Sequence, residues 1–281
     1  MPHIASPRQD QSTAAAMSSR RGRPRRVEAR DSEQLAAEWD KVAADRDQLI
    51  SEGRDLSYSY ILLPALLRLS ADWLVPKTRI LDVGCGTGKF ASELATNHPD
   101  SEIVGVDPSA LSVDIACSKR PARTNLDFRR ATVESFVEQT PPQSFDLVVA
   151  NMLFQNVSSL PDVLASCLKA LSPDGALVFA VPHPCFWPRY WKYEKAAWFQ
   201  YDREIWIEAP FRTSLSPENG LTTTHIHRPL ERYFSAFAAA GLMVEELVEP
   251  YPDEGIEGEY PIAWEFPRFL LGRCRPMGTR L

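Results

Sequence analysis

Short apolar runs alternate with amphipathic segments between residues 79 and 181. The runs expected to form strands are Arg79–Val83, Glu102–Val106, Leu126–Ala131, Phe145–Asn151 and Ala176–Val181. The segments with helical periodicity between them are Lys89–Asn97, Ser109–Ser118, Glu134–Glu138 and Leu160–Leu171. Short apolar strands that alternate with helices are typical of a parallel sheet covered on both faces. The pattern therefore predicts an α/β, doubly wound fold.

Further elements flank this series. Glu33–Ile50 has helical periodicity, with Ser32 as the expected N-cap. Ser57–Leu74 is a second helical stretch, and Pro64 inside it marks a break or a new first turn. The late elements are expected to be the helix Pro229–Ala240 with Gly241 as C-cap, and the strands Leu242–Glu249 and Ala263–Arg273.

The periodicity stops between Pro182 and His227, where aromatic residues and prolines become dense. The aromatic residues are Phe186, Trp187, Tyr190, Trp191, Tyr193, Trp198, Phe199, Tyr201, Trp206 and Phe211. So long a stretch without a clear period inside a compact fold indicates an elaborated cap or lid. Aromatic faces bind flat or greasy molecules and stabilise cations, but the same residues could simply form the core of the cap.

Composition narrows the class of protein. The chain has 281 residues, 44% of them hydrophobic, and no run of roughly 18 apolar residues that would span a bilayer. The amino terminus has no apolar signal core, which predicts a cytoplasmic protein without membrane association. The five cysteines, at 85, 117, 167, 185 and 274, form no CxxC pair, so we expect reduced thiols and no metal site.

Charge is distributed unevenly. Residues 1–26 carry a net charge of +5, whereas the whole chain carries −6. Residues 1–30 lack apolar periodicity and are expected to form a disordered basic tail. Within them Arg20–Arg26 resembles an AT-hook, a DNA minor-groove element, but one short copy is a weak signal, and the sequence favours a solvated tail. The acidic remainder makes general binding to nucleic acid unlikely.

Three glycines stand at alternate positions, 84, 86 and 88, within Arg79–Phe90, written RILDVGCGTGKF. They lie between a buried strand and a helix, at the sheet edge where ligands of open α/β folds bind. The spacing of Gly84, Gly86 and Gly88 is not the GxGxxG of dinucleotide sites, and no Walker lysine motif follows. Asp107 closes the next strand, about 20 residues on, where a carboxylate would accept from ribose hydroxyls.

The DVGCGTG run resembles motif I of class I S-adenosylmethionine-dependent methyltransferases of the small-molecule, secondary-metabolism type. The later runs SFDLVVANMLFQNV and HRPLERYFSAFAAAGLMVEELVEP are similar to further blocks of that family. The resemblance implies a Rossmann-like, mostly parallel, seven-stranded sheet that binds S-adenosyl-L-methionine. It divides the chain into a tail (1–30), a helical cap (31–75), a core (76–182), an aromatic-rich insertion (183–228) and a C-terminal completion of the sheet (229–281).

The resemblance also implies cofactor contacts. Those expected are Asp82, Gly84, Gly86, Gly88, Asp107, Pro108, Thr132, Val133, Asn151 and Met152. The family often has an Asp that binds the exocyclic amine of adenine. The matching stretch here is Ala131-Thr132-Val133-Glu134, which implies that the adenine is bound without a charged side chain.

The acceptor side is less defined by the sequence. His183 follows the strand Ala176–Val181 and is the first candidate for a general base, unless it only shapes the turn between two prolines. Phe186, Trp187, Tyr190, Trp191 and Tyr58 are the expected substrate-binding residues.

The leading hypothesis is a methyltransferase that acts on a hydrophobic or aromatic natural product. The alternatives are an RNA, DNA or protein methyltransferase, and a non-catalytic cofactor-binding regulator that uses the basic tail. By analogy with the family, the N-terminal helices could close the pocket or form a homo-oligomer interface.

Overall fold

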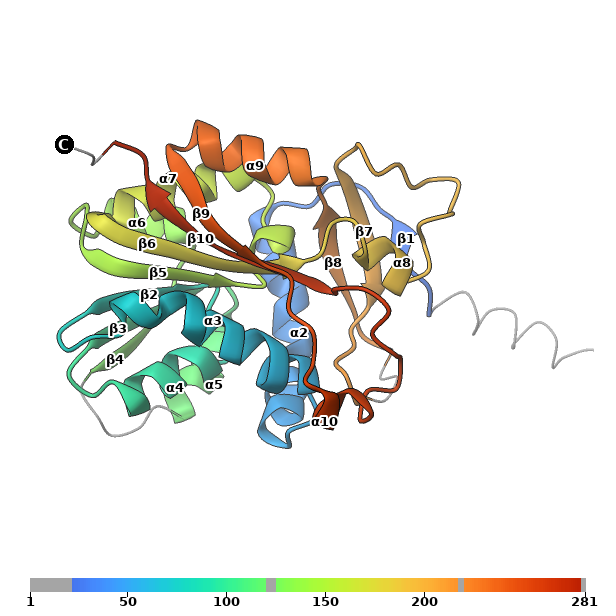
Figure 1. The fold of residues 1–281 in the computed structure, drawn as a ribbon, viewed down its shortest axis with the longest axis horizontal. Coiled ribbons are helices and arrows are strands. Elements are labelled where there is room, and N and C mark those ends of the chain that lie inside the picture. The colour runs from blue at the N-terminus through green and yellow to red at the C-terminus, as the bar shows by residue number, and fades with distance from the viewer. Residues whose placement is uncertain (1–21, 120–124, 217–219, 279–281) are drawn as a thin grey trace, which may run out of the picture.

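The computed structural model describes residues 22–119, 125–216 and 220–278 (Figure 1). Its centre is a seven-stranded sheet in the order β4-β3-β2-β5-β6-β10-β9. The strands are β2 (Arg79–Val83), β3 (Glu102–Asp107), β4 (Leu126–Arg130), β5 (Phe145–Asn151), β6 (Leu171–Pro182), β9 (Leu242–Val248) and β10 (Phe269–Pro276). The first five are parallel, and β10 runs antiparallel to both β6 and β9. The predicted doubly wound, mostly parallel sheet is thus confirmed.

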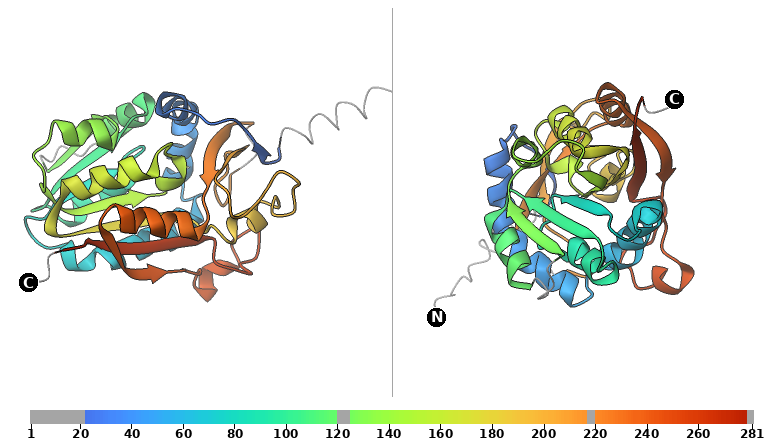
Figure 2. Two further views of the ribbon diagram at one scale, coloured as in Figure 1. Left: turned by 90° about the horizontal axis from the view of Figure 1, so that it is seen from above. Right: turned by 90° about the vertical axis from the view of Figure 1, so that its left-hand side faces the viewer.

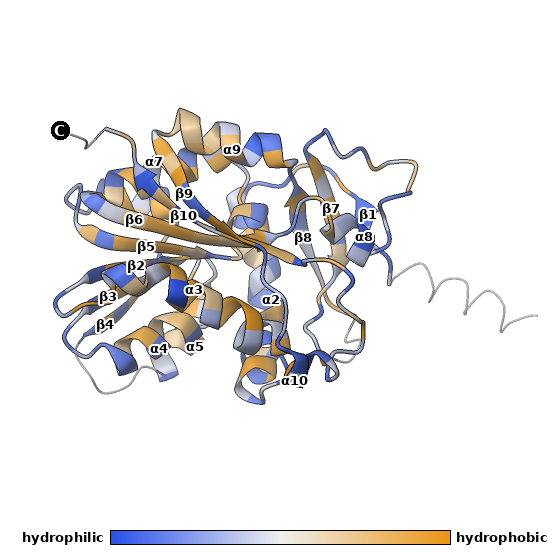
Figure 3. Cartoon of the chain, viewed as in Figure 1, coloured by the Kyte–Doolittle hydropathy of each residue, from blue (hydrophilic) through white to orange (hydrophobic). Residues whose placement is uncertain are grey.

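Helices cover both faces of this sheet, as Figure 2 shows. They are α3 (Leu63–Ser70), α4 (Lys89–Asn97) and α5 (Ala110–Lys119) on one face, and α6 (Val133–Glu138), α7 (Leu160–Ala170) and α9 (Leu230–Ala239) on the other. Side chains of a strand alternate between faces. In β2, Ile80 packs with the α3–α5 side and Leu81 with the α7–α9 side, and both are fully buried. The strands β5 and β6 therefore appear as mostly hydrophobic ribbons in Figure 3, although β6 has the exposed residues Pro173 and Asp174 near its start.

The N-terminal helices differ from the expectation in detail. Helix α2 (Ser32–Ser51) begins one residue earlier than predicted, because Asp31 forms a capping box with Gln34 and takes the role expected of Ser32. Tyr58–Leu62 is a π-helix that leads directly into α3, and Pro64 lies in the first turn of α3, where its missing N–H costs nothing.

The aromatic-rich insertion forms a small second sheet. The short helix α8 (Trp187–Tyr190) is followed by β7 (Ile205–Pro210) and β8 (Thr222–His227), which pair antiparallel. The outer neighbour of β7 is β1 (Arg25–Arg26).

Strand β1 corrects the expected disorder of residues 1–30 for the part that the structure describes. Arg25 pairs with Glu208 of β7 at 2.7 Å, and Arg30 pairs with Glu38 and Glu208. Part of the AT-hook-like run is therefore paired with a carboxylate of the cap, while residues 1–21 lie outside the described residues.

The last strand also begins later than expected. The stretch expected to form a strand from Ala263 contains a loop up to Arg268, preceded by α10 (Glu254–Glu257), and β10 starts only at Phe269. Arg268 itself is buried, and its backbone carbonyl accepts from His183 N–H at 2.8 Å. This loop brings a charged side chain beside the cap.

Candidate functional site

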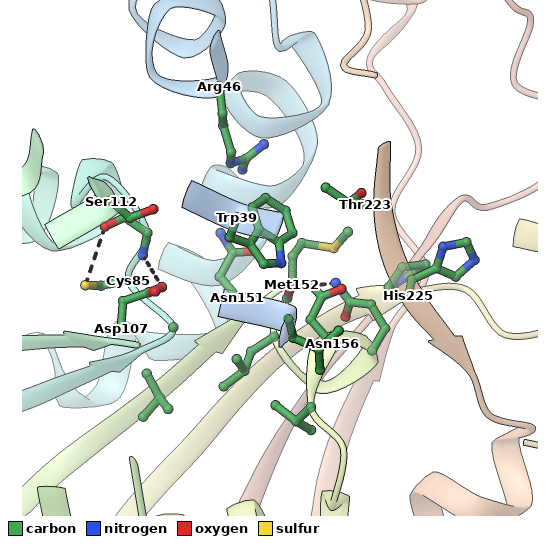
Figure 4. Close-up of a pocket in the computed structure, with 18 of the residues that line it drawn as sticks. Trp39, Arg46, Cys85, Asp107, Ser112, Asn151, Met152, Asn156, Thr223 and His225 are labelled. Carbon is green, nitrogen blue, oxygen red and sulfur yellow. Dashed lines mark hydrogen bonds between the residues drawn. The ribbon is translucent and has the colours of Figure 1, made fainter. Parts of the chain in front are cut away.

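A cavity of about 290 Å³ lies at the carboxyl edge of the large sheet. The strand ends of β2, β3 and β5 form its floor, helix α2 covers it, and the cap closes the far end. Figure 4 shows Trp39 and Arg46 of α2 above the strand ends that carry Asp107 and Asn151. Sheet, helix and cap thus enclose one continuous space.

The glycine loop supplies one wall of the cavity. All three glycines have positive φ, which side chains rarely adopt: 70° at Gly84, 53° at Gly86 and 76° at Gly88. A Cβ on Gly86 would meet no atom within 4 Å, so this residue leaves room for a ligand. A Cβ on Gly84 would lie 2.7 Å from Leu153 Cδ1.

Gly88 does not line the cavity, which corrects its expected ligand contact. It is the N-cap of α4 in a left-handed conformation. A Cβ there would lie 2.5 Å from Phe128 Cζ and 2.9 Å from Ala116 Cβ. The physical reason for this glycine is therefore the close packing of α4 on the sheet.

Two carboxylates face the loop, the buried Asp82 and the half-buried Asp107. Asp107 accepts from Gly86 N–H at 2.9 Å with Oδ2 and from Ser109 N–H at 2.8 Å with Oδ1, so it fixes the loop while each oxygen retains a free lone pair. Burial raises the pKa of Asp107 to about 6. Burial and, secondarily, the charge of Asp107 raise the pKa of Asp82 to about 7. Both groups would be stabilised as anions by a cationic ligand.

Pro108, Thr132 and Val133 line the cavity beside Asp107. The hydroxyl of Thr132 accepts a hydrogen bond from Ser135 N–H at 3.3 Å and so caps α6. This hydroxyl therefore already has a structural role. Val133 begins this helix, so its N–H is among those outside the helical ladder.

Asn151 and Met152 end β5 at the centre of the cavity floor. Met152 has φ of 55°, an uncommon value for a side-chain-bearing residue. Its backbone is held there because its N–H donates to Ala180 at 2.9 Å and its carbonyl accepts from Asn156 at 3.0 Å and from Gln155. Strain of this kind is typical of functional sites.

Three buried oxygens at this end have no hydrogen-bond partner: Asp82 Oδ2, Asn151 Oδ1 and Gln155 Oε1. Buried polar atoms are almost always bonded in folded proteins. These orphaned acceptors indicate a ligand that brings donors or positive charge.

The cap end is lined by Tyr58, Trp187, Tyr190 and Trp191, and their role in substrate binding stays a prediction. Trp187, Tyr190 and Trp191 are spaced i, i+3 and i+4 and therefore share one helical face. Phe186 precedes them by one position and lies outside the cavity, where it stacks on Phe266 at 5.4 Å. Its expected substrate contact is corrected for that reason.

His183 also lies outside the cavity, and the structure gives it no role as a base. Its neighbour Pro182 lines the cavity, and successive side chains of an extended strand point to opposite sides. His183 is buried and its Nε2 lies 2.6 Å from Glu249 Oε1. Burial lowers its pKa despite that carboxylate. The structural alternative for this histidine fits the geometry.

Several lining residues were not predicted from the sequence, among them Arg46, Gln155, Arg268 and the cavity-facing His225. No local motif marks them, because they come from segments far apart in the chain. Burial lowers the pKa of His225 to about 3, so it is a neutral and weakly basic wall.

Among the described residues, no group of three or more His, Cys, Asp or Glu side chains could hold a metal ion. Within the same residues, no helix combines the length and apolarity needed to span a membrane.

Comparison with known proteins gives matches for this arrangement. The family described as a methyltransferase domain matches residues 54–247. A malonyl-[acyl-carrier protein] O-methyltransferase of Halalkalibacterium halodurans is 31% identical over 106 residues, covering 37% of this chain and 39% of the relative. A ubiquinone biosynthesis O-methyltransferase of Rhodopseudomonas palustris is 32% identical over 105 residues, covering 36% and 39% respectively. The chain thus spans 39% of the length of these two curated relatives.

The crystal structure of an S-adenosylmethionine-dependent methyltransferase from Mesorhizobium loti matches 76% of this chain and 95% of its own. The TM-score is 0.55 at 24% sequence identity, so the two proteins share a fold. Together these matches confirm the family resemblance drawn from the glycine loop.

Proposed function

The chain belongs to the methyltransferase-domain family, and on this premise we propose that it transfers a methyl group from S-adenosyl-L-methionine to a hydrophobic or aromatic small molecule. The observation that carries the proposal is the single cavity joining the glycine loop to the aromatic face of α8. When bound, the cofactor would supply an electrophilic methyl group on a sulfonium: the acceptor atom bonds to this methyl group in line as the S–CH₃ bond breaks, and S-adenosylhomocysteine is the leaving group.

The residues at the sheet edge fit this cofactor. Asp107 retains lone pairs for two ribose hydroxyls, and open space above Gly86 lets the cofactor lie against the main chain. The orphaned oxygens of Asp82 and Asn151 suit its ammonium and sulfonium groups. Arg46 lines the same space and supplies positive charge for its carboxylate. The adenine ring would contact Pro108 and the first turn of α6. This binding of adenine would involve no charged side chain.

The chain contributes to catalysis chiefly by positioning and by excluding water. The rings of Trp187, Tyr190 and Trp191, which are tilted or edge-on to one another, form an aromatic wall that orients an apolar acceptor. Trp39 covers the space from α2. Fixing two reactants in productive geometry can remove roughly 7–11 kcal/mol from a barrier. The two curated relatives are both named O-methyltransferases, which favours oxygen as the acceptor atom.

Nothing in the described residues favours the alternatives that the sequence left open. The arginines that could serve a DNA-binding tail are engaged in part, since Arg25 and Arg30 pair with Glu208 on the cap. A natural-product acceptor, a cytoplasmic location and a homo-oligomer formed through the N-terminal helices stay predictions.

The test combines binding with turnover. Isothermal titration calorimetry should detect binding of S-adenosylhomocysteine to the protein. When the protein is incubated with S-adenosylmethionine and a panel of aromatic acceptors, mass spectrometry should detect a methylated product. Deleting residues 1–21 should leave both results unchanged. Absence of cofactor binding by the folded protein would exclude the proposal, and loss of turnover on tail deletion would favour the nucleic-acid alternatives.

A further inference from the structure

Unpartnered polar groups lie at both ends of the cavity, and the buried hydroxyl of Tyr58, which also lines it, is one of them. At the strand ends the orphaned atoms are the acceptors of Asp82, Asn151 and Gln155. At the cap end the buried Nε1 of Trp191 is a donor with no acceptor. Arg268 lines the same end and brings further donors. A cationic cofactor satisfies the first group, so the second must be satisfied by the other reactant.

Arg268 is buried without a carboxylate partner among the described residues. Its residue exposure is 4%, and its only protein acceptors there are the carbonyls of Ile262 and Ala263, both bonded by Nη2. The guanidinium carbon lies 4.2 Å from the ring centroid of Trp264 and 4.5 Å from that of Tyr190. The aromatic rings surround the charge, but they leave Nε and Nη1 without an acceptor.

Arg228 shows how this chain satisfies a buried guanidinium that has no ligand to bind. It is 2% exposed and pairs with Glu204 at 2.7 Å. It also donates to the carbonyls of Phe154 and Val157 at 2.7 Å each. Arg228 does not line the large cavity, whereas Arg268 does. Of the two buried arginines in the described residues, the one without a counter-ion is therefore the one beside the acceptor space.

A buried cation is stable only when it is paired and fully hydrogen-bonded. Arginine presents a planar fork that matches a carboxylate with two parallel bonds. The rings of Trp187, Tyr190 and Trp191 line the wall beside it and suit a flat apolar body. We propose that the acceptor is an organic acid with such a body, and that its carboxylate forms an ion pair with Arg268. This inference rests on the proposed function.

A structural role for Arg268 makes a different prediction. The bonds from Nη2 fix the loop at residues 262–263, and a variant that disturbs this loop would weaken every ligand equally. A ligand-binding role weakens only anionic ligands. Pairs of ligands that differ in charge alone therefore separate the two roles.

The experiment uses the full-length protein saturated with S-adenosylhomocysteine at pH 7.5. Three acids, benzoate, indole-3-acetate and 2-naphthoate, are titrated by calorimetry beside their uncharged amides. At least one acid should bind about 10- to 100-fold more tightly than its amide. Arg268→Met should remove that preference and leave the amide unchanged, while Arg268→Lys should retain part of it.

Arg189→Met is the matched control. Arg189 also lies over an aromatic ring, Phe266 at 4.9 Å, but it pairs with Glu265 and lies outside the cavity. Its loss should not change the preference for acids. The inference is overturned if no acid binds more tightly than its amide, or if Arg268→Met weakens acid and amide alike. Retained binding of S-adenosylhomocysteine in those cases leaves the proposed function intact, whereas its absence in the wild type defeats the proposed function itself.

Discussion

Replacing Asp107 with alanine should weaken cofactor binding by at least about 100-fold. The carboxylate has lone pairs for two ribose hydroxyls, and a hydrogen bond to a charged group contributes about 1.5–3 kcal/mol. Two such bonds correspond to about 3–6 kcal/mol, or roughly 10²- to 10⁴-fold in affinity. The lower end is expected because removing Asp107 also removes the cost of burying its charge, which is visible in its raised pKa.

The assay is calorimetric titration with S-adenosylhomocysteine at pH 8, with thermal unfolding measured on each variant. Glu102→Ala is the control, because Glu102 is on the same strand but is exposed, and within the described residues its ion pair is with Arg79 at the surface. This control should bind like the wild type. A folded Asp107→Ala protein with a dissociation constant within about threefold of the wild type would refute the assignment of the ribose to this carboxylate.

Three further outcomes are expected. Gly86→Ala should reduce cofactor affinity more than Gly53→Ala reduces it, because both have positive φ and open space but only Gly86 lines the cavity; equal affinities by calorimetry would contradict this. Affinity for S-adenosylmethionine should fall as pH drops below about 7, since Asp82 and Asp107 must ionise to face its positive charges and their pKa values are raised to about 7 and about 6. Binding should accordingly release protons near pH 6, which titrations in two buffers of different ionisation enthalpy would detect. His183→Ala should lower the melting temperature, because the bond to Glu249 is lost, but should retain turnover. A large fall in kcat without a lower melting temperature would instead support His183 as the general base.

The core could be predicted because local pattern and tertiary role agree there. In β2 the run Arg79–Val83 has the apolar character of a strand buried on both faces, and the structure reproduces its bounds. Asp107 could be predicted as a site residue because it ends a parallel strand, and the carboxyl ends of parallel strands lie at the sheet edge where ligands bind. For both, the sequence position determines where the side chain lies.

The cap could not be predicted in the same way. Strand β7 buries Ile205, Ile207 and Ala209, but the large outward-facing Trp206 hides this alternation. Strand β8 consists of threonine, histidine and one isoleucine, so it has little apolar signal, and its Thr224 is fixed by Glu38 from α2. Such strands are defined by partners far away in the chain rather than by their own pattern.

Helix α2 joins the two halves of the cavity through residues that flank one aromatic side chain. Glu38 accepts from Thr224 N–H of the cap at 2.7 Å, and Asp40 accepts from Leu111 N–H at the start of α5 at 2.9 Å. Trp39 lies between these two anchors in sequence, lines the cavity, and packs edge-on against Phe211 at 6.2 Å. Because one helix is bonded both to the core and to the cap, the wall over the cofactor space and the wall beside the acceptor space are a single element. The position of Trp39 is therefore fixed from both sides, which is the preorganisation that alignment of two reactants requires.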